Sequence, residues 1–126
     1  MVNVKKLLTK IMDNMIPKSV FMNIVPDSGY LLDDDWNMRR CGNIITITLS
    51  THRTVSTPVG SNIFAGTFGS TTGSQFRPKY LVNGCGYSGS TCGVAQFDPS
   101  GRFIIRCTGA ALPAHQAIYV SVTYIM

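Results

Sequence analysis

The sequence predicts an all-β protein, an antiparallel β-sandwich or jelly-roll-like domain, preceded by a short N-terminal α-helix. Apolar residues recur at helical spacing only at the N-terminus. Behind them, about seven short segments alternate between apolar and polar side chains, as half-buried strands do. Turn residues separate these segments at short intervals and no fixed repeat appears, which favours a sandwich over a propeller or solenoid. We therefore divide the chain into a helix over 1–16 and a β domain over 17–126.

The N-terminal segment has the pattern of a self-associating helix. The a and d positions of two heptads are occupied by Met1, Val4, Leu8, Ile11 and Met15. A helix of this length is marginal alone and needs partners or a packed surface. The same stripe, widened by Leu7 and Met12, also fits a helix that packs against its own domain. The pattern predicts an oligomerisation stem, with intramolecular packing as the alternative.

The segment after the helix is expected to contain one strand and one loop. Pro17 ends the helix, and a short apolar segment over 20–25 predicts the first strand. Three adjacent aspartates at 33–35 stand directly before Trp36, the only tryptophan. Because like charges repel each other, we expect 33–35 to form a solvated loop.

The clearest strand lies over 45–50, where apolar residues alternate with threonine and serine. Apolar residues resume over 63–68. The glycine, serine and threonine residues over 69–74 predict a loop.

Two hairpins and a terminal strand complete the β domain. Ser88-Gly89-Ser90 predicts one hairpin loop, and Asp98-Pro99-Ser100-Gly101 has the chemistry of a type I turn. The strands expected here cover 80–87, 91–97, 102–108 and 118–125. The last strand reaches the end of the sequence, so we expect it to be anchored in the sheet.

The amino-acid composition limits the classes of function that are compatible with this chain. Charged residues are 13% of the chain and glutamate is absent, so much of the surface must be neutral and rich in hydroxyl groups. Such a surface suits a carbohydrate-facing or tightly assembled protein. The net charge of +5 is dispersed, with no run of basic residues longer than two, whereas nucleic-acid binding concentrates charge among aromatics. We expect no nucleic-acid partner.

The chain shows no targeting or membrane segment. Lys10 and Asp13 interrupt what would have to be the apolar part of a secretion signal. No segment approaches the length of a membrane span, so no membrane insertion is expected. Synthesis in a reducing cytoplasm would leave the cysteines as free thiols that act as small apolar residues: Cys41, Cys85, Cys92 and Cys107.

Metal and catalytic sites find little support. The cysteines and both histidines lack zinc-ligand spacing, so no metal or other cofactor is expected. Glycan hydrolysis needs two carboxylates held close together, and the chain offers only six dispersed or clustered aspartates. We therefore expect no enzymatic activity.

Five short segments of the β domain follow one another in a recognisable order. They are RCGNIITITL at 40–49, IFAGTF at 63–68, FRP at 76–78, GRFII at 101–105 and VSVTYI at 120–125. In this order and spacing they resemble the C-terminal head domains of bacteriophage tail fibres and receptor-binding proteins. The resemblance covers residues 36–126, although the loop at 69–74 replaces a Leu-Pro-Gly-Tyr element of the family. It implies a virion protein that forms trimers on a helical or fibrous stem.

The candidate binding residues follow from the chemistry of sugar sites. These sites combine an aromatic face with carboxylates, amides or arginines that hold hydroxyl groups. Trp36 beside Asp34 and Asp35 offers that grouping, although tryptophan is more often a core residue. Further candidates on loops or strand ends are His52, Arg53, Tyr87 and His115.

The sequence thus predicts a homotrimeric phage head, made in the bacterial cytoplasm and carried on the virion with other virion proteins. It would bind a host-surface saccharide without catalysis. The alternative is an architectural virion protein, a capsid decoration or fibre-assembly module that binds only protein.

Overall fold

The computed structural model describes residues 3–15, 18–20, 24–68 and 76–126. In these ranges the chain forms one helix, α1 (Val4–Met15), and nine strands. The strands are β1 (Lys18–Val20), β2 (Ile24–Pro26), β3 (Leu31–Cys41), β4 (Ile44–His52), β5 (Asn62–Phe68), β6 (Val82–Ser88), β7 (Thr91–Phe97), β8 (Arg102–Gly109) and β9 (Ile118–Ile125). The all-β fold with a short N-terminal helix is confirmed.

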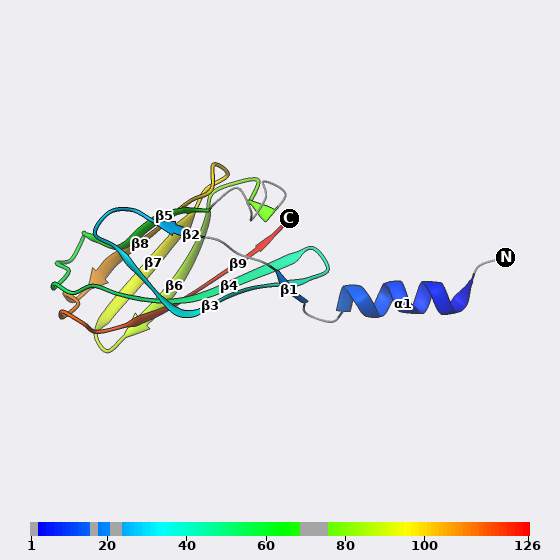
Figure 1. The fold of residues 1–126 in the computed structure, drawn as a ribbon, viewed down its shortest axis with the longest axis horizontal. Helices are drawn as coiled ribbons and strands as arrows, with labels where there is room; N and C mark the ends of the chain where they lie inside the picture. Colours follow the sequence, from blue (N-terminus) through cyan, green and yellow to red (C-terminus); the bar gives the residue numbers. More distant parts are fainter. Residues whose placement is uncertain (1–2, 16–17, 21–23, 69–75) are drawn as a thin grey trace.

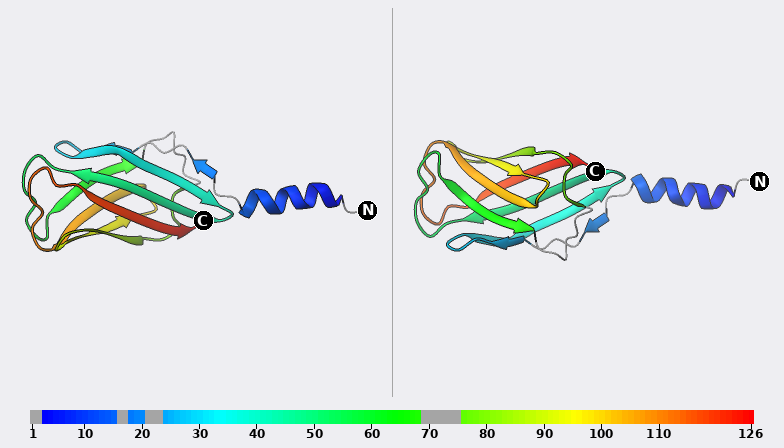
Figure 2. Two further views of the ribbon diagram at one scale, coloured as in Figure 1. Left: turned by 90° about the horizontal axis from the view of Figure 1, so that it is seen from below. Right: turned by 90° about the horizontal axis from the view of Figure 1, so that it is seen from above.

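All nine strands belong to one antiparallel sheet with the order β1-β3-β4-β9-β6-β7-β8-β5-β2. The sheet curls back on itself, so that β3, β4 and β9 form one layer over β7, β8 and β5 in the other (Figures 1 and 2). This arrangement is a sandwich made from one nearly closed sheet.

The core fills the space between the two layers. On one side, Ile47 of β4 pairs with Val122 of β9, and both are buried. On the other side, four phenylalanines pack in edge-to-face or tilted pairs with ring centroids 4.3 to 6.4 Å apart: Phe64, Phe68, Phe97 and Phe103. Such aromatic pairs stabilise beyond their buried area. The alternation read from the sequence therefore marks the inner face.

The two layers are joined by the antiparallel pairing of β6 with β9. These strands pair at only three positions, around Gly86↔Val120. A Cβ atom on Gly86 would lie 2.0 Å from the carbonyl oxygen of Tyr119, and one on Gly84 would lie 2.2 Å from that of Ser121. Glycine is required here because the two backbones approach more closely than any side chain permits.

The helix α1 projects away from the sheet (Figure 1). Its N-terminus is capped by Asn3, whose Oδ1 accepts a hydrogen bond from the Lys6 amide at 3.1 Å. The apolar stripe stays exposed, with Leu8 at 54% and Ile11 at 45%. The structure therefore does not show the intramolecular packing that was the alternative for this helix.

Two local predictions need correction. The aspartates at 33–35 lie within β3 and not in a loop. The single strand expected over 20–25 is replaced by β1 and β2, which pair with different strands, β3 and β5. The expected loop at 69–74 lies outside the described residues. The hairpin loops after β6 and β7 are confirmed.

Candidate functional site

The pairing of β3 with β4 is interrupted just before Trp36. Leu32 pairs with Thr51 and Trp36 pairs with Leu49, so residues 33–35 of β3 oppose Ser50 alone. Three residues facing one means that β3 carries two extra residues, a β-bulge. The three aspartates therefore form a bulge within a strand.

Asp33 joins the bulge to β4. Its Oδ2 accepts a hydrogen bond from Ser50 Oγ at 2.6 Å, and its Oδ1 lies 2.5 Å from His52 Nδ1. The side chains of Asp33 and His52 are 23% and 32% exposed. Bonds to a carboxylate are stronger than neutral ones, which explains how a half-buried aspartate is tolerated in this strand. We call these three residues the Asp33 cluster.

Next to the bulge, the structure contains a shallow groove of about 470 Å³. Three strands of one layer and β6 supply its walls, with the residues Trp36, Asn37, Thr48, Leu49, Cys85, Tyr119, Val120 and Ser121. We call it the Trp36 groove. Among the described residues that line it, none carries a charge.

The lining of the Trp36 groove suits a polar, uncharged ligand. Trp36 and Tyr119 offer aromatic faces, while Asn37, Thr48 and Ser121 offer one amide and two hydroxyls. An aromatic surface with a few convergent polar groups is the usual composition of a small-ligand site. A sugar ring has both an apolar face and hydroxyl groups that match this lining.

Tyr119 was not among the residues singled out from the sequence. Its position on the outward face of the terminal strand follows from alternation, because Ile118 and Val120 are buried. Its proximity to Trp36 does not, since it depends on β9 pairing with β4 and β4 with β3. Tyr87 pairs with Tyr119 across β6 and β9, and both side chains are largely exposed, at 70% and 61%.

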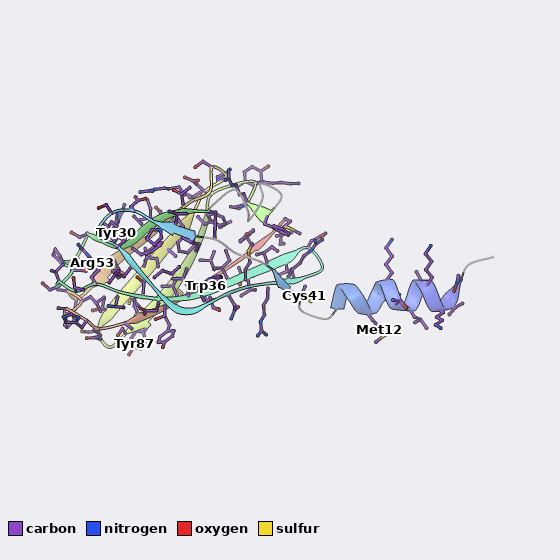
Figure 3. The ribbon with its side chains drawn as sticks, in the orientation of Figure 1. Met12, Tyr30, Trp36, Cys41, Arg53 and Tyr87 are labelled. Carbon is purple, nitrogen blue, oxygen red and sulfur yellow. The ribbon has the colours of Figure 1, made fainter. Side chains whose placement is uncertain are left out.

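The other candidates lie elsewhere. Arg53 and Tyr30 lie at the end of the β domain opposite the helix, while Trp36 lies nearer its middle (Figure 3). The Arg53 guanidinium carbon sits 5.2 Å from the centroid of the Tyr30 ring, and the His115 amide donates to the Arg53 carbonyl oxygen at 2.7 Å. His52, the last residue of β4 and the neighbour of Arg53 in the sequence, belongs to the Asp33 cluster. The structure therefore separates Trp36 from Arg53 and His115.

Asp34 and Asp35 have their backbones in the bulge, and their side chains lie outside the described part of the structure. Their predicted role beside Trp36 stays a prediction.

A salt bridge also lies outside the Trp36 groove. Arg102 Nη2 lies 2.5 Å from Asp27 Oδ2, and this hydrogen bond lowers the pKa of the Asp27 carboxyl from its ordinary value. Both side chains are more than a third exposed, so the pair contributes little to stability.

The cysteines differ in their environments. Cys107 is buried in the core, where it acts as a small apolar residue, whereas Cys85 and Cys92 are exposed thiols. Cys85 and Cys92 occupy outward positions on β6 and β7, so they are not buried among apolar side chains as Cys107 is. Within the described ranges, no three histidine, cysteine or aspartate side chains gather in a way that could hold a metal ion. In the same ranges, no helix has the length and apolar character needed to cross a membrane.

No protein-family model matches the chain, and no curated protein matches it either. Solved structures with a similar fold include two viral head domains. The head domain of the lactococcal phage bIL170, described as a receptor-binding domain, matches with a TM-score of 0.55 at 15% sequence identity, covering 88% of this chain and 99% of that one. The fibre head domain of snake adenovirus 1 has a TM-score of 0.47 at 15% identity, covering 89% and 95%. The chain therefore has the fold of a phage receptor-binding head domain, as the order of its sequence motifs predicted.

Proposed function

We propose that this chain is the receptor-binding head of a phage virion, a homotrimer that recognises a host-surface saccharide in the Trp36 groove. The observation that carries the proposal is the fold, which the chain shares over nearly its whole length with the receptor-binding head of phage bIL170. The protein would be made in the bacterial cytoplasm and assembled with other virion proteins. It would bind without catalysis and without a cofactor.

The helix supports the trimer. With Met1 at an a position, Leu8 also occupies a, while Val4 and Ile11 occupy d. Leucine at a with β-branched residues at d favours bundles of three or four helices over dimers. The flanking g and e positions hold Leu7 and Met12, both exposed, which widens the apolar surface available to neighbouring helices. A parallel bundle of these helices would hold the β domains side by side at one end.

The uncharged lining of the Trp36 groove supports a saccharide ligand. Ring stacking on Trp36 or Tyr119 would supply contact area, and the hydroxyl and amide groups would set the orientation of the sugar. Because no charged side chain of the described residues lines the groove, the ring it takes would be neutral.

One observation favours the architectural alternative. Tyr87 and Tyr119 form an exposed aromatic pair beside the groove, and tyrosine is enriched at protein interfaces. A head that binds only virion proteins through this pair would show no affinity for glycans.

Screening the purified protein on an array of host-wall and other glycans tests the proposal. The wild-type chain should bind a defined set of glycans, and Trp36→Ala should lose about tenfold or more in affinity, equivalent to about 1.4 kcal/mol. Tyr80→Ala is the matched control, because Tyr80 is an exposed aromatic residue outside the groove.

Binding of the control variant should equal that of the wild type. Absence of glycan binding by correctly folded wild-type trimer would favour the architectural alternative. Equal binding by Trp36→Ala would place the site elsewhere on the head.

A further inference from the structure

The bulge in β3 ends at the residue that defines the groove. Trp36 is the first residue to regain a partner on β4 after the interruption, opposite Leu49. A bulge bends its strand and re-aims the side chains that follow it. The geometry of residues 33–35 therefore determines where Trp36 lies.

The Asp33 cluster connects this bulge to the floor of the groove. Ser50 and His52 lie two residues apart on β4 and so on the same face of the strand, with Asp33 bonded to both. Thr48 is the next residue on that face, and it lines the groove. Tyr119, the partner of Ser50 across β9, lines it as well. The cluster is therefore adjacent to the Trp36 groove on two strands.

The burial of Ser50 shows how closely the bulge covers β4. Thr46 and Thr48, on the same face, are half-buried, whereas Ser50 is only 1% exposed. A buried hydroxyl without a partner is costly, and Asp33 supplies that partner. Two charge-assisted bonds from one carboxylate to two side chains of the neighbouring strand restrict the bulge to one arrangement.

We propose that Asp33, with Ser50 and His52, is a positioning residue for the saccharide site: its carboxylate holds the β3 bulge against β4 and thereby places Trp36 in the groove. This inference rests on the proposed function for its ligand. The position of Trp36 can nevertheless be measured without any ligand, because Trp36 is the only tryptophan of the chain.

The first measurement is the fluorescence of Trp36 in the full chain without saccharide. Asp33→Ala and Ser50→Ala should shift the emission to longer wavelength and make Trp36 more accessible to acrylamide quenching. Asp33→Asn should restore most of the wild-type signal, because an amide oxygen can accept from Ser50 while the amide nitrogen donates to a neutral His52. The result would show that geometry, and not only charge, holds the bulge.

Asp98→Ala is the matched control. Asp98 also accepts a hydrogen bond from a serine, Ser100, at 2.5 Å, but it does so in the turn between β7 and β8. Its loss should leave the fluorescence of Trp36 unchanged even where the melting temperature falls. A purely structural role for Asp33 would give the same pattern as this control.

The second measurement is the affinity for a glycan that the wild type binds on the array. Asp33→Ala should weaken it by roughly tenfold to a hundredfold, as removal of groups that orient metal ligands does. Wild-type fluorescence and quenching in folded Asp33→Ala would overturn the inference. If that variant does not fold, the same result in Ser50→Ala overturns it. If the wild type binds no glycan, the proposed function fails, and the fluorescence alone decides the positioning role of Asp33.

Discussion

The strand pair β4–β9 and the helix α1 both carry apolar side chains at regular spacing, but only the strand pair buries them. Ile47 and Val122, which face each other across the two strands, are 0% and 1% exposed. Leu8 and Ile11 of the helix stay about half exposed. The apolar row of the strands is covered by the opposite layer of the same chain. In the proposed trimer, the stripe of the helix would be covered by neighbouring helices, so the stability of the helix should depend on protein concentration.

The largest effect is expected when a charge is placed on the helix stripe. Leu8→Asp or Ile11→Asp would bury one unpaired charge per subunit in a helix bundle, at a cost of several kcal/mol in total. Light scattering should show a fall from trimer to monomer mass, while the melting temperature of the β domain stays the same.

Thr9→Asp is the control, because Thr9 lies on the polar face of the helix and is exposed. Unchanged mass in both stripe variants would mean that the helix does not carry association.

Truncation of the strand row should have a comparable but intramolecular effect. Ile47→Ala should lower the free energy of unfolding by about 2 to 5 kcal/mol, through lost burial and the cavity left behind. Truncation of Ile45 or Leu49 to alanine should lower the free energy of unfolding by a similar amount. Truncation of the smaller side chains Val120 and Val122 should lower it less.

Chemical denaturation measures the loss in the free energy of unfolding of these core variants. Thr123→Ala, on the exposed face of β9, should change stability by about 0.5 kcal/mol or less. Equal losses on the two faces of β9 would contradict the assignment of its buried face.

A smaller effect is expected at the edge of the core. The hydroxyl of Tyr124 donates a hydrogen bond to the Phe76 carbonyl oxygen, and burial raises the pKa of its phenol. The folded state favours the protonated phenol. The stability that Tyr124 contributes is therefore fully present below its ordinary pKa of 10.0, and it is lost as the pH rises above that value.

Tyr124→Phe should cost about 1 kcal/mol at neutral pH, the net value of one hydrogen bond. It should also reduce the fall in stability above pH 10.0. Denaturation curves of both proteins across this range provide the measurement, and an identical alkaline fall would assign it to other groups.

The smallest effect is expected for the exposed pair of Asp27 and Arg102. The pKa of Asp27 is lowered in the folded state. The stability that its carboxylate contributes is therefore present above its ordinary pKa of 3.8 and is lost as the pH falls below that value. Asp27→Asn should therefore change the melting temperature slightly at neutral pH and not at all in strong acid. A large loss at neutral pH would show that this surface pair is not solvent-screened.

The features that depend only on neighbouring residues could be predicted from the amino-acid sequence. Alternation over 45–50 and 118–125 identified two central strands and their buried faces. The turn at Asp98 was predictable because its side chain bonds the backbone of Ser100, only two residues away. The apolar stripe of the helix was equally readable, because heptad spacing is local.

The candidate site, in contrast, depends on how the strands are arranged in the folded chain. Three adjacent aspartates read locally as a solvated loop, yet Asp33 is bonded to Ser50 and His52, which lie 17 and 19 residues further along the chain. Tyr119 reaches the Trp36 groove only because β9 pairs with β4. Periodicity and turn chemistry operate over a few residues. The bulge and the groove depend instead on strand register, which brings together residues that are distant in the sequence.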